Sequence, residues 1–389
     1  MHLGDLHLGK RVNGFSLLED QRAVLAEIRD IVRERDVEAV LIAGDVYDRP
    51  TPPVYAVELA DEFITDLVES GVRVFVIGGN HDSTARLAFA SRITREKGLV
   101  IAKPYDGALE WFDLDDPAGK APVRVHLLPF VTPLDVRRFF DDREVSTYDE
   151  AVAAVVEHAE MGPGANILVA HQLVLGSGEV TRSDSEQISI GGVDEVSASH
   201  FDGFDYVALG HLHAPQWVCG KDGSGTVVRY CGSPLKYSFS EVSQRKAATI
   251  VDVDADGAHV EEFPLHAVHD MRELSGTIDE MRAALEEDPS LSDCYMRAIL
   301  TEPVVNAKAK LADLFPLIMR IEFDYVSGES AAAPPAIENL EQADPTEVFA
   351  SLFKSVNGRD MDEDESEALG AVLERMVAAE RDETEGGAR

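Results

Sequence analysis

Short apolar runs alternate with amphipathic stretches over the first 265 residues of this 389-residue chain. The apolar runs have the length and the β-branched content of buried strands. The amphipathic stretches at residues 17–35 and 54–69 each place their apolar side chains on one face of a helix. The predicted strands are Ala39–Ala43, Val72–Ile77, Ile167–Ala170 and Tyr206–Leu209. This alternation predicts an α/β fold, a β-sandwich flanked by helices.

Three later strands follow without a recognisable helix before the next strand. They are Val123–Phe130, Thr226–Cys231 and Ala247–Val253. Parallel strands need a crossover connection, which is usually a helix. We therefore expect these three strands to be added to the fold in an antiparallel way.

The pattern changes near residue 266, where strands and helices alternate in a shorter unit. Its predicted elements are the strand Met271–Leu274, the helix Thr277–Glu287, the strand Tyr295–Leu300, the helix Ala307–Phe315 and the strand Ile318–Phe323. A segment containing AAAPP follows and has the composition of a linker. We predict a first domain at 1–265, a small α/β domain at 266–328, a linker at 329–343, a helix pair at 344–379 and an acidic tail at 380–389.

The two C-terminal helices carry apolar stripes that include Phe349, Leu352, Phe353, Leu369 and Leu373. Helices this short are marginal in water unless something covers their apolar face. They can fold back on the preceding domain, or they can bind a partner protein that offers a hydrophobic groove.

Composition places the chain among soluble globular proteins, with 45% hydrophobic and 28% charged residues. No stretch approaches the roughly 18 to 20 consecutive apolar residues of a membrane helix. The N-terminal sequence MHLGDLHLGK has no apolar signal-peptide core. The 3 cysteines are too few and too scattered for a disulfide framework. We expect a cytoplasmic protein without a membrane segment.

The net charge of −37 argues against a chain that binds nucleic acid through a general basic surface. Phosphate contacts depend on local charge, however, and bound metal ions invert the local field. Charge alone therefore does not exclude a nucleic-acid substrate.

Polar clusters follow five of the predicted strands, each at the point where the strand ends. Their members are Asp5 and His7, Asp45 and Asp48, Asn80 and His81, His171, and His211 and His213. A single histidine at a strand end is usually structural, but the strand C-terminal ends of an α/β fold form ligand sites. Five such clusters predict one shared site.

Carboxylate, amide oxygen and imidazole ligands without thiolate suit Mn²⁺, Fe²⁺, Mg²⁺ or Zn²⁺. The pair Asp5 and His7 and the pair His211 and His213 are each two residues apart, so each pair can serve one or two ions. Two ions about 3.5 to 4 Å apart can clamp the attacking and leaving oxygens of a phosphoryl displacement. The residues therefore indicate a two-metal phosphoesterase.

The motifs D-x-H, G-D-x-x-D, G-N-H-D, a lone histidine and G-H-x-H, in this order, resemble the calcineurin-like metallophosphoesterase superfamily. The longer segments GDLHLGK, AGDVYDRPTPP, GGNHDS, GHLHAPQ and YCGSPLKYSFSE resemble the nuclease subunits of double-strand-break processing complexes. The resemblance implies a metallophosphoesterase β-sandwich flanked by helices. It also implies that residues 266–328 form a capping domain and that C-terminal helices follow.

The resemblance also implies a role for each residue. Asp5, His7, Asp45 and His213 would hold one ion, and Asn80, His171 and His211 would hold the other, with Asp45 bridging both. The ions would be Mn²⁺, with Mg²⁺ as the second choice. His81 would face the scissile phosphate, Asp48 would orient His81 through its carboxylate, and Asp82 would be a turn residue. Since Met1–Gly4 alone precede Asp5, we expect a short first strand that holds Asp5 and His7 loosely, or a start further upstream.

The implied function is a Mn²⁺-dependent DNA nuclease that acts with an ATPase in DNA repair and recombination. It would degrade double-stranded ends as a 3′–5′ exonuclease and cut single-stranded and hairpin DNA as an endonuclease. Lys10, Arg11 and Lys236 would contact DNA, and the helix pair would bind the coiled-coil base of the ATPase. A homodimer within a heterotetramer is expected.

Two alternatives remain. One is a small-molecule phosphodiesterase or protein phosphatase of the same superfamily, which would need neither the capping domain nor the C-terminal helices. The other is a scaffold that retains metal without catalysis, which the presence of every ligand and of His81 disfavours.

Overall fold

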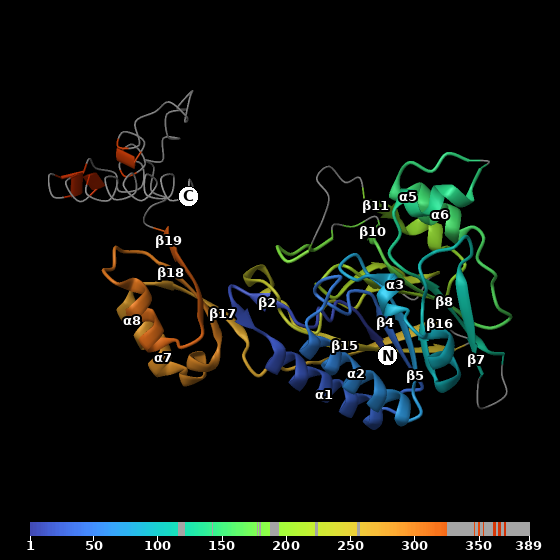
Figure 1. The fold of residues 1–389 in the computed structure, drawn as a ribbon. Coiled ribbons are helices and arrows are strands. Elements are labelled where there is room, and N and C mark those ends of the chain that lie inside the picture. The colour runs from blue at the N-terminus through green and yellow to red at the C-terminus, as the bar shows by residue number, and fades with distance from the viewer. Residues whose placement is uncertain are drawn as a thin grey trace, which may run out of the picture. The chain divides into compact units, whose positions relative to one another are not determined.

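A computed structural model describes residues 1–324 apart from 116–120, 142, 177, 179, 187–193, 222–224 and 255–256. It also describes residues 346, 349–350, 353, 361–362, 365–366 and 369–370. The chain divides into two compact units (Figure 1). The first contains Met1–Arg272 and Asp293–Tyr295, and the second contains Glu273–Ser292 and the chain from Met296 onward. None of the helices within the described residues is long and apolar enough to cross a membrane.

The first unit is built on two six-stranded sheets. One runs in the order β16-β15-β1-β4-β5-β6 and the other in the order β13-β14-β12-β9-β8-β7. The strands of the first sheet are β1 (His2–Leu3), β4 (Ala39–Ala43), β5 (Arg73–Ile77), β6 (Leu99–Ile101), β15 (Ala247–Asp254) and β16 (Gly257–Pro264). Those of the second are β7 (Glu110–Leu114), β8 (Val123–Leu128), β9 (Asn166–His171), β12 (Tyr206–Gly210), β13 (Gln216–Cys219) and β14 (Val227–Tyr230). Short strands also pair, β2 (Arg11–Val12) with β3 (Phe15–Ser16), and β10 (Leu173–Leu175) with β11 (Glu195–Ser197).

An apolar core fills the space between the two sheets. Phe75 and Ile77 of β5 belong to the same buried cluster as Val169 of β9 and Tyr206 and Ala208 of β12. Helices cover the outer faces, so that α1 and α2 lie on one side and α5 and α6 on the other (Figure 1). The helices of this unit are α1 (Leu18–Glu34), α2 (Val54–Glu69), α3 (Thr84–Leu87), α4 (Ser91–Thr94), α5 (Pro133–Val136) and α6 (Tyr148–Val156). This arrangement confirms the predicted sandwich flanked by helices.

Strand directions correct one expectation from the sequence. β15 pairs antiparallel with β1 and β16, as expected. For β8 and β14 the expectation holds on one side only: β8 pairs antiparallel with β7 but parallel with β9, and β14 pairs antiparallel with β13 but parallel with β12. The physical reason is that α6 forms the crossover between β8 and β9, and β13 reverses the chain before β14. Both connections were missed in the sequence pattern.

The first strand is only 2 residues long but lies inside its sheet. His2 pairs with Leu41 of β4 on one side and Thr249 of β15 on the other. Beyond the strand, the amide of Asp5 donates to Gly44 O at 3.1 Å and that of His7 donates to Asp45 O at 2.9 Å. The strand is short, as expected, but hydrogen bonds to the loop after β4 fix the main chain of both Asp5 and His7.

The second unit contains a three-stranded sheet in the order β17-β18-β19. Its elements are β17 (Met271–Gly276), α7 (Ile278–Glu287), β18 (Tyr295–Leu300), α8 (Ala307–Leu314) and β19 (Ile318–Phe323). The five predicted elements are confirmed. Thr277 begins α7, since its hydroxyl accepts from Glu280 N at 3.2 Å while the Glu280 carboxylate accepts from Thr277 N at 2.7 Å. The predicted linker at 329–343 and tail at 380–389 lie outside the described residues.

The two sheets of the first unit approach each other closely where β1, β4 and β12 end. A Cβ atom on Gly210 would lie 1.9 Å from the carbonyl oxygen of Ala43. A Cβ atom on Gly4 would lie 3.4 Å from that oxygen and also 3.4 Å from Gly210 Cα. The sheets can meet at this edge because glycine has no side chain.

Gly210→Ala is therefore expected to lower the free energy of unfolding by roughly 3 kcal/mol or more, the upper end of overpacking effects, because a main-chain oxygen cannot rotate away. Gly178→Ala is the matched control, since nothing lies within 4 Å of its Cβ position, and it should change stability by less than about 0.5 kcal/mol. Urea unfolding of both variants measures the difference. Equal stabilities would show that the sheets are not in contact here.

Candidate metal centre

The structure brings the five predicted clusters together at one edge of the sandwich. The first sheet delivers residues after β1, β4 and β5, and the second delivers them at the end of β9 and after β12. The seven predicted ligands are Asp5, His7, Asp45, Asn80, His171, His211 and His213. Each of them except Asn80 is buried, and Asn80 is partly exposed.

Four of these residues have an unusual backbone conformation. Asp5, His7, Asp45 and His211 have φ angles of +53°, +43°, +50° and +106°. Side chains other than glycine rarely adopt positive φ, and each such residue costs about 1 to 3 kcal/mol. The surroundings must hold this conformation, and Asp5 contributes because its carboxylate oxygens accept from His211 N at 3.0 and 3.1 Å.

One group of ligand atoms surrounds His7. Its Nε2 lies 3.2 Å from His213 Nε2 and 3.5 Å from Asp45 Oδ2. Ligand atoms of Asp5, His7 and His213 all lie within 4.8 Å of one another. Two imidazole lone pairs that face each other repel unless a proton or a cation lies between them. This group fits the first ion implied by the resemblance.

A second group surrounds Asn80. Its Oδ1 lies 3.0 Å from His171 Nε2 and 3.2 Å from His211 Nδ1. Asp45 Oδ2 lies 3.4 Å from His171 Nε2. The same oxygen lies 3.5 Å from His7 Nε2 in the first group, so Asp45 contacts both groups of ligand atoms.

Protonation in this cluster also fits divalent cations. His7 Nδ1 and His211 Nε2 are buried without a hydrogen-bond partner. Burial lowers the pKa of His7 and lowers that of His211 to about 3, so both rings are neutral, as metal ligands must be. Burial and the nearby Asp45 raise the pKa of Asp5, a carboxyl that a cation would stabilise in its charged form.

Asp45 and His171 form an ion pair within the cluster. Burial alone would raise the pKa of Asp45, but His171 outweighs it and lowers that pKa below its usual range. Burial likewise opposes protonation of His171, but Asp45 raises the pKa of His171 to about 9. A cation bound at Asp45 would replace this proton, because imidazole binds metal only when neutral.

His81 lies at the rim of the cluster, where its ligand atom comes within 4.8 Å of those of His7 and Asp48 and its Nε2 lies 4.0 Å from Asp45 Oδ2. Its side chain is 10% exposed, whereas those of His7 and His171 are 0% exposed. Its Nδ1 donates to the main-chain oxygen of Asp48 at 3.0 Å. Asp48 therefore contacts His81 as expected, but through its carbonyl. The Asp48 carboxylate accepts instead from Lys10 Nζ at 2.8 Å.

Asp82 joins two of the loops. One carboxylate oxygen accepts from Val46 N and Gly79 N at 3.0 Å each, and the other accepts from Tyr47 N at 3.0 Å. Burial and Asp45 raise the pKa of Asp82 to about 6. This position agrees with the turn role expected for Asp82, and it fixes the loop that carries Asp45 against the loop that carries Asn80.

Residues around His213 were missed in the sequence. His213 Nδ1 lies 2.7 Å from Ser185 Oγ and 3.4 Å from Glu241 Oε1, and its amide donates to Glu186 Oε1 at 2.8 Å. Lys246 Nζ donates to Glu241 Oε2 at 2.6 Å and to His213 O at 2.9 Å. Partners of this kind fix the tautomer of a ligating imidazole. The sequence could have indicated Glu241, because this residue ends the motif YCGSPLKYSFSE.

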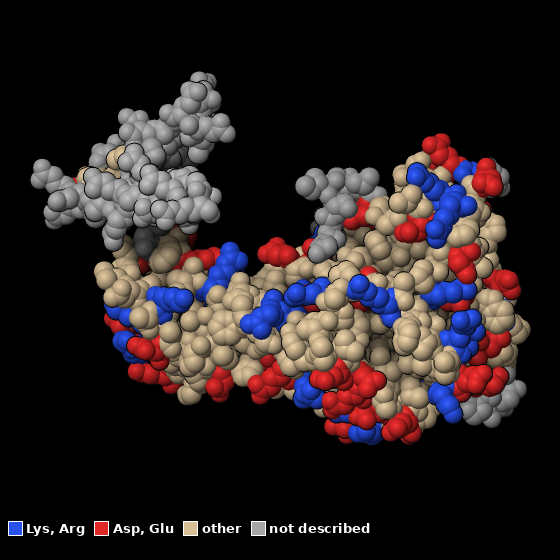
Figure 2. Space-filling model, in the orientation of Figure 1, with Lys and Arg blue, Asp and Glu red and all other residues tan. Residues whose placement is uncertain are grey.

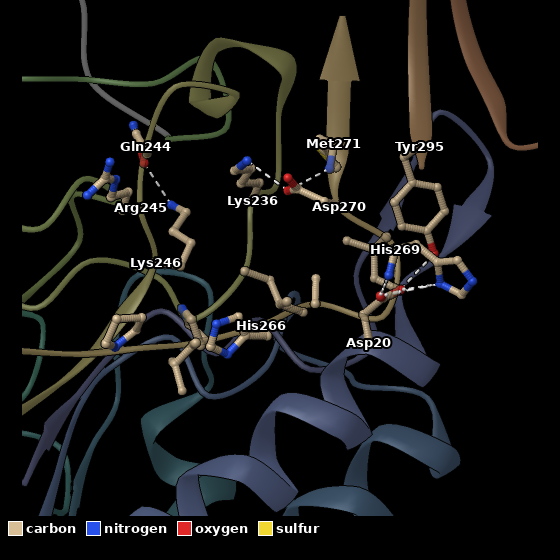
Figure 3. A pocket seen from close by; sticks show the side chains of 16 residues that line it. Asp20, Lys236, Gln244, Arg245, Lys246, His266, His269, Asp270, Met271 and Tyr295 are labelled. Atoms are coloured by element: carbon tan, nitrogen blue, oxygen red, sulfur yellow. Dashed lines mark hydrogen bonds and ion pairs between the residues drawn. The ribbon is translucent and has the colours of Figure 1, made fainter. Parts of the chain in front are cut away.

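The three cations expected to contact DNA differ in their surroundings. Lys10 pairs with Asp48, and Lys236 Nζ donates to Asp270 Oδ1 at 2.7 Å (Figure 3). Arg11 is exposed and donates to Gly14 O. Lys236 lines a cavity of about 330 Å³ that contains none of the seven predicted ligands. Lys246, whose Nζ donates to His213 O, also lines this cavity.

The residues expected to bind a partner are partly described. Phe349 is 45% exposed and Leu369 is 8% exposed, and Phe353 is partly buried. Leu352 and Leu373 lie outside the described residues.

Comparisons with known proteins identify the family of the chain. Residues 1–215 match the family model described as calcineurin-like phosphoesterase, and residues 267–357 match the model described as type 5 capsule protein repressor C-terminal domain. The chain is 28% identical over 390 residues to the SbcD subunit of nuclease SbcCD from Staphylococcus epidermidis, covering 98% of this chain and 99% of that protein. It is 27% identical over 383 residues to the corresponding protein of Staphylococcus saprophyticus, covering 97% and 98%. Because the first model matches more than half of the chain, the chain belongs to the calcineurin-like phosphoesterase family.

Proposed function

We propose that the chain is a Mn²⁺-dependent DNA nuclease that works with an SbcC-type ATPase in DNA repair and recombination. It would act as a 3′–5′ exonuclease on double-stranded ends and as an endonuclease on single-stranded and hairpin DNA. One observation carries the proposal. The similarity to the SbcD subunit of nuclease SbcCD extends over 98% of the chain, well beyond the phosphoesterase match at 1–215. A small-molecule phosphodiesterase or protein phosphatase, the alternative, leaves the second match at 267–357 without a role.

The mixed oxygen and imidazole ligands support two Mn²⁺ ions over two Mg²⁺ ions. Asp5, His7, Asp45 and His213 would hold one, and Asn80, His171 and His211, with Asp45 shared, would hold the other. Four of these seven side chains are imidazoles, whereas Mg²⁺ prefers an all-oxygen shell that includes several waters. Mn²⁺ accepts both oxygen and imidazole ligands. When bound, two such ions supply Lewis acid catalysis for attack of water on phosphorus.

His81 would act on the leaving group. Its Nδ1 is engaged by Asp48 O, so its Nε2 is the nitrogen left to face the substrate. In the protonated ring, Nε2–H can donate its proton to the leaving oxygen as the P–O bond breaks. Asp48 would be a positioning residue, because it fixes the ring without touching the substrate.

Local charge supports a nucleic-acid substrate despite the net charge of −37. On the drawn face of the first unit, Lys and Arg side chains form a row along the middle, and acidic side chains gather along the lower edge (Figure 2). Lys10, Arg11 and Lys236 are the proposed contacts to the DNA backbone. The chromosomal substrate leads us to propose a cytoplasmic location.

An exposed apolar patch supports a homodimer within a heterotetramer. The patch consists of Val54, Tyr55, Val57, Phe89 and Ile93, whose exposures are 72%, 36%, 43%, 84% and 74%. Arg86 Nη1 of α3 donates at 2.8 Å to Pro50 O, which ties the chain shortly before Phe89 to the chain shortly before α2. Clustered large apolar side chains of this kind mark protein interfaces. The ATPase would bind the C-terminal helices instead.

The first test is a cleavage assay on linear duplex and hairpin DNA, with and without the ATPase. We expect Mn²⁺-dependent degradation by the wild type. Asp45→Asn should abolish it and lower the metal content from two ions per chain, because the bridging carboxylate is lost. Asp30→Asn is the matched control, since Asp30 is 68% exposed on α1. Near-normal cleavage with two bound ions in Asp45→Asn would exclude the bridging role, and hydrolysis of small phosphodiesters without DNA cleavage would favour the alternative function.

His81→Ala should keep both ions and DNA binding but lower turnover by roughly 10² to 10⁴, the usual contribution of a positioned acid or base. Metal analysis and single-turnover cleavage measure the two properties separately. His259→Ala, at a side chain 60% exposed, should match the wild type in both. Loss of metal from His81→Ala would make His81 a ligand.

Deletion of residues 340–389 should leave a folded, metal-binding nuclease that no longer co-purifies with the ATPase. The physical reason is that Phe349 is 45% exposed, and short helices cannot cover such a side chain alone. Phe349→Asp in the full chain should weaken the same complex. Unchanged complex formation by the truncated chain would place the docking site elsewhere, and early melting would make the helices part of the core.

A further inference from the structure

A second cavity, of about 230 Å³, lies directly beside the metal cluster. We name it the Phe130 pocket. It is lined by Asn80, Thr84, Tyr105, Phe130 and Arg138, among others. These residues follow β5, β6 and β8, so three neighbouring connections of the sandwich build the pocket. It is part of the first unit.

The pocket and the metal cluster share a wall. Asn80 lines the pocket while its Oδ1 contacts His171 and His211. The Phe130 ring lies 6.4 Å from the His171 ring, centre to centre, at 77°. The amide of Phe130 donates to Gly78 O at 2.8 Å, which fixes the start of this wall. A group attached to a phosphate at the metal cluster can therefore reach the pocket.

The lining combines aromatic side chains with a cation. Phe130 is partly buried and Tyr105 is 7% exposed. Arg138 is exposed, and its guanidinium donates to Tyr105 O at 3.4 Å, a long bond that leaves most of its donors free for a ligand. Thr84 adds a hydroxyl group to the same lining, and Asp82 and Asp135 add carboxylates whose oxygens already accept from main-chain amides. Flat rings with a nearby guanidinium are the features that bind nucleobases and their phosphates by stacking and charge.

We propose that the Phe130 pocket receives the nucleobase next to the scissile phosphate, stacked on Phe130, while Arg138 contacts the adjoining phosphate. This inference rests on the proposed nuclease function. A base can enter the pocket only after it leaves its stack, which costs least at unpaired or frayed positions. The pocket would thus favour DNA ends and hairpin loops over intact duplex.

The test measures cleavage of an intact and an abasic substrate by the wild type and three variants. The substrates are two duplexes that differ by one abasic nucleotide at the cleaved position, and the proteins are wild type, Phe130→Leu, Arg138→Ala and Arg137→Ala. Loss of one stacked base should slow the wild type by roughly 5- to 150-fold. Phe130→Leu should cleave the intact duplex more slowly by a similar factor and no longer distinguish the two substrates.

Arg137→Ala is the matched control, because Arg137 is the exposed neighbour of Arg138 and does not line the pocket. It should behave as the wild type does, whereas Arg138→Ala should raise KM on both substrates. Metal titration of Phe130→Leu must match that of the wild type, which separates base binding from damage to His171. If the wild type cuts both duplexes equally fast, or if Phe130→Leu keeps the full discrimination, the inference is wrong.

Failure of the nuclease function gives a different result. In that case the wild type leaves both duplexes intact, and the comparison moves to the p-nitrophenyl esters of thymidine 5′-phosphate and of abasic deoxyribose 5′-phosphate. A preference for the thymidine ester that Phe130→Leu abolishes would retain the pocket as a nucleobase site. Equal rates on the two esters would overturn it.

Discussion

The site depends on the close approach of two sheets at a single edge. Gly210 of β12 and Ala43 of β4 come so near that a methyl group on Gly210 would lie 1.9 Å from a carbonyl oxygen. The first sheet carries Asp5, Asp45 and Asn80, and the second carries the histidines that follow β9 and β12. Neither sheet has a complete ligand set. The sandwich must therefore form before either group of ligands exists, and the metal cluster belongs to the tertiary fold.

Strain and buried charge at this edge explain why further polar side chains, Asp82, Glu241 and Lys246, surround the predicted ligands. Positive φ at Asp5, His7, Asp45 and His211 is unfavourable locally and persists only when neighbouring groups hold it. Asp82 holds two loops through three amides. On the other side, the buried Glu241–Lys246 pair fixes the segment around His213. Removal of one partner of such a pair is strongly destabilising, so these side chains link stability to ligand geometry.

Much of this molecule could be read from the sequence, and the failures have identifiable causes. Helix α2 and strand β4 coincide with their predicted limits, because an apolar stripe on one face of a helix and an unbroken apolar run in a buried strand are both clear signals. Helix α6 was missed, and with it the parallel direction of β8. The motifs predicted which side chains would gather. They could not predict that Asp48 contacts His81 through its main chain, or that Ser185 contacts His213. A sequence pattern carries no information on main-chain contacts or on pairs formed by a distant loop.

The charges around the site also bear on how an acidic chain could hold DNA. Lys10 and Lys236 each pair with a carboxylate, Asp48 and Asp270, so neither is a free positive charge in this structure. Without a cation, the charge of Asp45 is matched by His171 and the pKa of Asp5 is raised, so the cluster by itself offers a phosphate no net positive charge. Under the proposed function, the attraction for phosphate therefore comes chiefly from the bound ions, whose charge inverts the local field. DNA binding would then require metal loading first, and the surface could remain acidic without loss of affinity at the site.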